Sequence, residues 1–167
     1  MPLPDWFKSH ATPDNAPNDD DSHRRHIAAN DPAFPATREA AIAMIGAAIS
    51  DIATPLGYTR NSDIWAHSTT RGKTVMHLQR NRFGWDAQIN LRFLPALGDF
   101  PDDSIWATGE EIHLGHFGAG HIAYLDVSTD AASLDPYMYI LHTCALPWLH
   151  GHHRGWPAIA DYLPKSM

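Results

Sequence analysis

Two neighbouring segments of the chain, residues 74–83 and 86–94, alternate apolar and polar side chains with a period of two. This alternation is typical of half-buried β-strands, because successive side chains of a strand point to opposite faces of a sheet. Between the segments, Gly84-Trp85 suits a two-residue type II′ turn, which takes glycine at its first central position. The sequence therefore predicts an antiparallel hairpin.

The two-residue turn also predicts how the strands pair. Gln79 is expected opposite Asn90, Asn81 opposite Gln88, and His77 opposite Arg92, so that all six lie on one face. The other face carries apolar side chains: Met76, Leu78, Ile89, Leu91 and Phe93. A slip of one strand by one residue would move its polar side chains to the apolar face, which argues against that alternative.

Helical periodicity precedes and follows the hairpin. Thr37 is a suitable N-cap, isoleucines and leucine recur at spacings of three and four from Ile42 to Leu56, and Gly57 suits a left-handed stop. Shorter strands are expected at residues 64–67, 111–114 and 121–127, and helices at 134–148 and 156–163. We expect an α+β fold, with an antiparallel sheet of about four to five strands and the N-terminal and C-terminal helices packed on one face.

Domain organisation follows from length and composition. A chain of 167 residues fits one domain. Residues 1–36 contain many prolines, the acidic run at 19–21 and few aliphatic side chains, a composition that buries too little apolar surface to offset the cost of ordering. The sequence predicts a flexible arm at 1–36 and a single α+β domain at 37–167.

Net charge limits the partners. With histidine neutral the formal charge is −7, which argues against nucleic acid and anionic membranes and favours a basic or neutral protein. No signal-peptide pattern is present at the N-terminus, and the longest apolar stretch, 40–49, is too short to span a membrane. The single cysteine, Cys144, forms no intrachain disulfide and fits a reducing compartment. We expect a cytoplasmic protein.

Twelve histidines make the chain histidine-rich, and three groups have spacings seen among metal ligands. The strongest group combines a carboxylate with imidazoles beside flexible glycines: Glu111, His113, His116 and His121. Solvent-exposed or hydrogen-bonded histidines are the more common explanation for such a group, because no HExxH helix or cysteine pair accompanies it. We expect no metal or other cofactor, and keep this group as the alternative metal site.

Catalytic motifs are not recognisable. Cys144 and His142 are two residues apart on an expected helix and so would not face each other. The apolar neighbours of Cys144 indicate a buried, unreactive thiol. No phosphate-binding glycine loop, paired-carboxylate pattern or serine elbow is present. An enzyme is therefore not the favoured interpretation.

Four stretches together resemble the bacterial domain-of-unknown-function 4304 family over roughly residues 40–163. They are residues 56–60 with Trp65, 78–82, 89–91 and 145–149. Asn81 departs from the resemblance, since the family often has a small hydroxyl residue there. The resemblance implies a small intracellular bacterial domain and supplies no catalytic residues.

The polar face of the hairpin is the preferred candidate site, because Trp and Arg are enriched where proteins bind each other. Its candidate partner-binding residues are His77, Gln79, Asn81, Trp85, Gln88, Asn90 and Arg92. The alternative is a solvated sheet face. We predict a non-enzymatic protein that binds a protein partner, with a toxin-neutralising (immunity) protein as its most concrete form. The other class is a histidine-dependent metal-binding protein or metalloenzyme.

Overall fold

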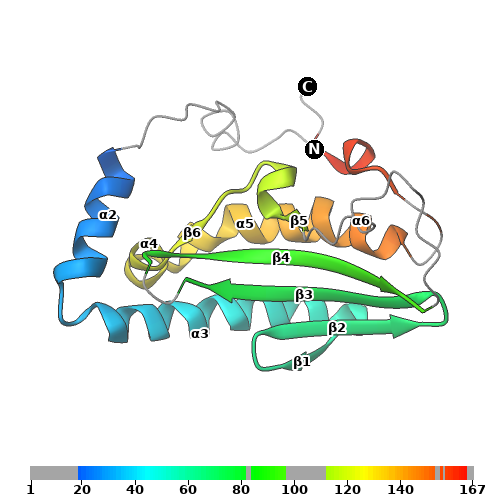
Figure 1. The fold of residues 1–167 in the computed structure, drawn as a ribbon, viewed down its shortest axis with the longest axis horizontal. Helices are drawn as coiled ribbons and strands as arrows, with labels where there is room; N and C mark the ends of the chain where they lie inside the picture. The colour runs from blue at the N-terminus through cyan, green and yellow to red at the C-terminus, as the bar shows by residue number, and fades with distance from the viewer. Residues whose placement is uncertain (1–18, 82–83, 97–111, 153–154, 156, 165–167) are drawn as a thin grey trace.

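The structure is a computed structural model that describes residues 19–81, 84–96, 112–152, 155 and 157–164. In this part of the chain, helices lie beside a long twisted sheet (Figure 1). The first eighteen residues of the predicted arm lie outside the described residues.

The described residues form a six-stranded antiparallel sheet in the order β1-β2-β3-β4-β5, with β6 also paired to β4. The strands are β1 Thr59–Asn61, β2 Ile64–Thr69, β3 Gly72–Arg80, β4 Asp86–Pro95, β5 Ile112–His113 and β6 Ile122–Ala123. β3 and β4 are the longest strands and form the predicted hairpin. β5 and β6 pair with different parts of β4, on the edge away from β3.

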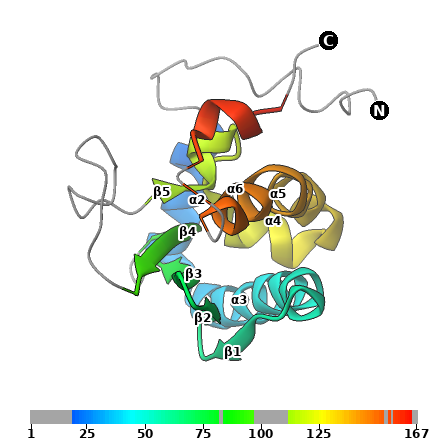
Figure 2. The same cartoon turned by 90° about the vertical axis from the view of Figure 1, so that its right-hand side faces the viewer.

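Helices α3 to α6 lie on one side of the sheet (Figure 2). The α-helices are α2 Asp19–Asn30, α3 Phe34–Ala53, α4 Tyr124–Thr129, α5 Asp135–Ile140 and α6 Leu146–Gly151. Short 3₁₀ turns occur at Thr54–Leu56, Leu114–Phe117, Ala131–Leu134 and Ile159–Tyr162, and a π-turn at Leu141–Ala145 joins α5 to α6. The predicted α+β class and the antiparallel sheet with helices at both ends of the chain are confirmed.

The core lies between the sheet and these helices. From β3 and β4 it takes the apolar face of the hairpin, with Met76, Leu78 and Leu91 fully buried. α3 faces it with Ile45 and Ile49, also fully buried. Each such side chain stabilises the fold by roughly 1.5–3 kcal/mol through its removal from water. The expected alternation of the hairpin therefore explains which face the helices cover.

The hairpin register differs from the prediction by two residues. Gln79 pairs with Gln88 and His77 with Asn90, because the connection runs from 81 to 85 rather than through a two-residue turn. Asn81 closes this longer loop: its side-chain amide donates to Asp86 Oδ1 at 3.1 Å. A shift of two residues leaves every side chain on its predicted face, so the division into polar and apolar faces is correct although the predicted pairs are wrong.

The first helices begin earlier than the sequence suggested. α3 starts at Phe34 and not after Thr37. The Phe34 side chain is buried, and the proline that follows it suits the first turn of a helix. It ends as expected, because Gly57 adopts φ +89° after the 3₁₀ turn. Within the predicted arm, residues 19–30 form α2. The flexibility of the arm stays a prediction, but its last eighteen residues are largely helical.

The segment 121–127 was predicted as one strand and is not. Only Ile122 and Ala123 pair with β4; Tyr124 then begins α4, which buries Tyr124 and Val127 on one face. The expected helix at 134–148 is present as α5, the π-turn and α6. The π-turn precedes Pro147, which has no N–H to continue regular helical hydrogen bonding.

By length and composition, one helical stretch of the described residues is long and apolar enough to cross a membrane, residues 34–56. The sequence prediction considered only the apolar stretch 40–49 as too short to span a membrane, and so underestimated the length of the helix. Its isoleucines at 42, 45 and 49 are buried against the sheet. Core helices often pass the same test, so we interpret α3 as a core helix.

Candidate functional site

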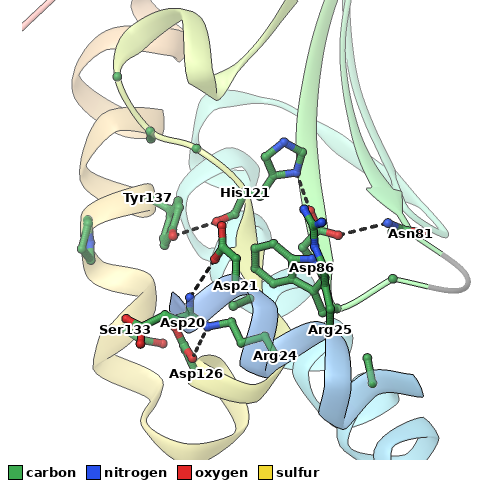
Figure 3. Close-up of a pocket in the computed structure, with 18 residues that line it drawn as sticks. Asp20, Asp21, Arg24, Arg25, Asn81, Asp86, His121, Asp126, Ser133 and Tyr137 are labelled. Atoms are coloured by element: carbon green, nitrogen blue, oxygen red, sulfur yellow. Dashed lines mark hydrogen bonds and ion pairs between the residues drawn. The ribbon is translucent and has the colours of Figure 1, made fainter. Parts of the chain in front are cut away.

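A cleft of about 950 Å³ opens at the end of the sheet where β3 ends and β4 begins. Its walls come from α2, the hairpin loop, the segment 118–123, α4 and the start of α5 (Figure 3). These elements are far apart in sequence, so only the fold brings them together. A cleft of this size accommodates a small molecule or several side chains of a protein.

Asp86 and His121 form an ion pair in the wall of the cleft. His121 Nδ1 lies 2.5 Å from Asp86 Oδ2, and the amide of Asn81 donates to the other carboxylate oxygen at 3.1 Å. Asp86 is 6% exposed as a residue, whereas the His121 side chain is 53% exposed. The buried carboxylate thus holds a half-exposed imidazole in one orientation.

The two groups change each other's protonation. Burial alone would raise the pKa of Asp86, but hydrogen bonds from His121 and Asn81, together with the charges of His121 and Arg25, hold that pKa below its ordinary value. The hydrogen bond to Asp86 raises the pKa of His121, against the opposing effect of partial burial. The pair therefore stays charged over a wider pH range than either group alone.

Arg24 holds α2 to α4 on the opposite wall. Its guanidinium makes two hydrogen bonds to Asp126, Nε to Oδ1 at 3.1 Å and NH2 to Oδ2 at 2.7 Å, and a third to Asp21 at 3.0 Å. The guanidinium carbon also lies 5.8 Å from the centre of the Trp85 ring, within cation–π range. One arginine thus connects α2, α4 and the hairpin loop.

Two further side chains complete the wall: Ser133 from the 3₁₀ turn Ala131–Leu134 and Tyr137 from α5. Tyr137 donates its hydroxyl to the backbone oxygen of His121 at 2.9 Å, and burial raises the pKa of this tyrosine. Ser133 Oγ is buried and bonds no group among the described residues. Tyr137 therefore fixes the backbone that carries His121, and Ser133 offers a hydroxyl to a ligand.

The predicted partner-binding residues divide between two places. Asn81 and Trp85 line the cleft. The others lie on the sheet face away from the core: His77, Gln79, Gln88, Asn90 and Arg92. By register Asp86 belongs to this same face, two residues before Gln88, so the polar face of β4 leads directly into the cleft. Asn90 is nearly buried on it and donates to Gln79 Oε1 at 2.7 Å.

Of the alternative metal residues that the structure describes, His113 and His116 lie in contact and His121 has a different partner. His113 and His116 pack edge to face, and both side chains accept backbone hydrogen bonds at the start of the 3₁₀ turn Leu114–Phe117: His113 Nδ1 from Gly115 N–H at 3.1 Å and His116 Nδ1 from His113 N–H at 3.2 Å. His121 bonds Asp86 instead, and Glu111 lies outside the described residues. Over the described part of the chain, no group of three or more His, Cys, Asp or Glu side chains is placed to hold a metal ion.

His152 and Cys144 are buried among core side chains. His152 is 2% exposed and packs between Phe93 and Trp148. His150 stacks on Tyr58. Cys144 is buried, and burial raises the pKa of its thiol, as expected for an unreactive cysteine.

Sequence reasoning missed the central pair of the cleft. The sequence predicts Asp86 as the first residue of a strand, and His121 as the first residue of another strand and a candidate metal ligand. They are 35 positions apart and meet because β6 pairs with the first residues of β4. No local spacing signals this contact. Arg24 and Asp126, 102 positions apart, are missed for the same reason.

Comparison with known proteins gives no relative: no family model matches the chain, and no curated protein or solved structure matches it significantly. The resemblance to the domain-of-unknown-function 4304 family therefore stays a prediction.

Proposed function

We propose that this chain is a non-enzymatic protein that binds a protein partner, and that the cleft is its recognition site. The observation that carries the proposal is the cleft itself, which is lined by Trp85, Arg24 and Tyr137 from three separate elements. Trp, Tyr and Arg are the residue types most enriched at binding hot spots.

The rigidity of the cleft supports this proposal. Arg24 is bonded to two carboxylates, Asp86 to two donors, and Tyr137 to the backbone of His121. Side chains already held by neighbours lose less conformational freedom when a partner binds, so more of the contact energy remains as affinity. The net charge of −7 would steer a basic partner to the protein.

The continuity of the cleft with the polar face of β4 supports a protein rather than a small molecule. Asp86, Gln88 and Asn90 alternate along β4 on one face, so polar groups extend from the cleft along the strand. Stable protein interfaces bury about 800 Å² on each partner, which is more than a cleft alone provides. The predicted sheet-face residues thus become the outer part of the same surface.

The test is capture of a partner by the immobilised full chain from an extract of its own source cells, comparing three variants. Trp85→Ala changes the cleft, His77→Ala changes the sheet face far from it, and Lys73→Ala changes an exposed cation on the same hairpin. We expect one saturable partner, retained by Lys73→Ala and bound at least tenfold more weakly by Trp85→Ala.

Circular dichroism and thermal unfolding must first show that each variant is folded. Capture of the same partner with equal affinity by Trp85→Ala would contradict the assignment of the cleft. Loss of binding only in His77→Ala would move recognition to the sheet face, and the absence of any saturable partner would contradict the binding function.

A toxin-neutralising role is a narrower proposal within the same class. It requires that the partner be toxic and that the complex remove its activity. Co-expression of the chain with a toxin candidate from a neighbouring gene tests it: growth should be restored by the wild type and not by Trp85→Ala.

The Asp86–His121 pair supports a second candidate, proton transfer in an enzyme, because a carboxylate bonded to Nδ1 is how general-base histidines are oriented. Among the described residues no hydroxyl or thiol bonds His121 Nε2, so water would be the nucleophile. Hydrolysis of simple ester or phosphodiester substrates that disappears in His121→Gln would favour this candidate over the first.

A further inference from the structure

The helix α2 is attached to the rest of the protein by few contacts. Its residues 20–30 include no fully buried side chain. Four side chains at helical spacing on one face are partly buried: Asp21, Arg24, Ile27 and Ala28. Of these four, only Ile27 and Ala28 are apolar and pack against the core. A helix of 12 residues is marginally stable on its own in water, so α2 depends on these contacts.

Arg24 supplies the polar part of the attachment. Its guanidinium donates two hydrogen bonds to Asp126 of α4 and lies over the ring of Trp85 in the hairpin loop. The Arg24 and Asp126 side chains are 22% and 41% exposed, so water competes for the ion pair and weakens it. The attachment of α2 therefore combines a small apolar contact with an ion pair that solvent reaches.

A short exposed connection joins α2 to the core. Residues 31–33 are exposed, whereas Phe34, the first residue of α3, is buried. Asp31 N–H donates to Ile27 O at 2.8 Å, and the Asp31 side chain accepts from Ala33 N–H at 2.8 Å. Figure 1 shows α2 at one end of the molecule, rising from the start of α3. A change of backbone angles at 31–33 can therefore move α2 from the cleft while the core stays packed.

We propose that α2 is a clasp for the cleft, and that the docking of α2 and the binding of the protein partner stabilise each other. The inference rests on the proposed function and adds how the site is regulated. Undocking of α2 removes one wall of the cleft and takes the Arg24 guanidinium away from Trp85. A partner that binds only the docked state shifts the chain toward that state. The lining residues that α2 supplies are Asp20, Asp21, Arg24, Arg25 and Ala28.

The first experiment separates the clasp from the surface of the cleft. Ile27 lies on the docking face of α2 but does not line the cleft, so Ile27→Asp should undock α2 without replacing a lining residue. His23→Asp makes the same change of charge at an exposed position of the same helix and is the matched control.

We expect hydrogen exchange in α2 of the full chain to become at least about tenfold faster in Ile27→Asp, with exchange in β3 and β4 unchanged. The affinity for the partner captured by the immobilised chain should fall at least about tenfold, because apparent affinity is reduced by the fraction of chains that can bind. His23→Asp should change neither quantity.

The second experiment needs no variant. Exchange in α2 of the wild-type chain is followed while the captured partner is added. If only the docked state binds, exchange in α2 slows in proportion to the concentration of free partner, about hundredfold at about one hundred times Kd. This titration decides the matter if faster exchange in β3 and β4 shows that Ile27→Asp disrupts the core.

Unchanged exchange in α2 at saturating partner would overturn the inference. Exchange in α2 of Ile27→Asp at the wild-type rate would also overturn it, as would unchanged affinity for the partner despite rapid exchange. In each of these cases, weaker binding of the partner by Trp85→Ala would leave the proposed function standing. Equal affinity of Trp85→Ala and wild type would instead refute the proposed function, and the clasp with it.

Discussion

Replacing His121 by Gln should destabilise the protein by an amount that depends on pH. Gln keeps a polar side chain that can hydrogen-bond Asp86 but cannot carry a charge. Hydrogen bonds to charged groups contribute about 1.5–3 kcal/mol. Because the His121 side chain is 53% exposed, screening by solvent reduces the charge-dependent part to about 1 kcal/mol.

The sign follows from the direction of the pKa shift. The pKa of His121 is raised in the folded protein by its hydrogen bond to Asp86. Its contribution is therefore fully present below the unfolded pKa of about 6.5 and is lost as the pH rises through the folded pKa. Asp86, whose pKa is lowered, contributes in the opposite direction and loses its effect only in acid.

Urea unfolding of wild type and His121→Gln at about pH 5.5 and pH 8.5 measures this difference. We expect the free energy of unfolding to fall by about 1 kcal/mol at the lower pH, with a smaller fall at the higher pH. His142→Gln, an exposed histidine elsewhere, should show no such difference between the two pH values. A loss for His121→Gln that is equal at both pH values, or larger at the higher one, would refute the ion-pair argument.

Three further predictions concern the fold. Gly72→Ala should lower the free energy of unfolding by at least about 2 kcal/mol, because Gly72 has φ +153° and an added Cβ would overlap a backbone carbonyl of β4. Gly120→Ala is the control: an added Cβ there meets open space, so the free energy of unfolding should change by less than about 0.5 kcal/mol. Chemical denaturation measures both values. Arg24→Gln should speed proteolysis within α2 about fivefold by removing its bonds to α4, and Arg25→Gln should not; equal rates for both would contradict the role of Arg24. Cys144 should react with a thiol reagent only in denaturant, and rapid reaction in the native protein would show that its burial is wrong.

Periodicity predicts the parts of this fold that depend on local physics. The hairpin faces and the stripe of α3 follow from burial of alternate or helically spaced apolar residues, so they were predictable. The length of the hairpin loop was not predictable, because a hydrogen bond between Asn81 and Asp86 closes a longer connection than the Gly84-Trp85 dipeptide indicates. The result was wrong cross-strand pairs on correctly assigned faces.

The cleft was less predictable than the sheet. Trp85 and Asn81 were identified as candidate binding residues, but for the sheet face and not for a cleft. Asp86 and His121 meet through pairing of β6 with β4, a two-residue contact too short to leave a pattern in sequence. α2 was missed because its composition is polar, and the bonds of Arg24 to α4 depend on tertiary contact.

Hydrogen exchange of the full chain with and without its captured partner tests most directly whether the cleft is the recognition site. The proposal predicts slower amide exchange in α2, in the segment around Trp85 and Asp86, and at residues 118–126, with little change in β1 and the outer part of α3. Protection confined to β1, β2 or α3, with unchanged exchange around the cleft, would contradict it.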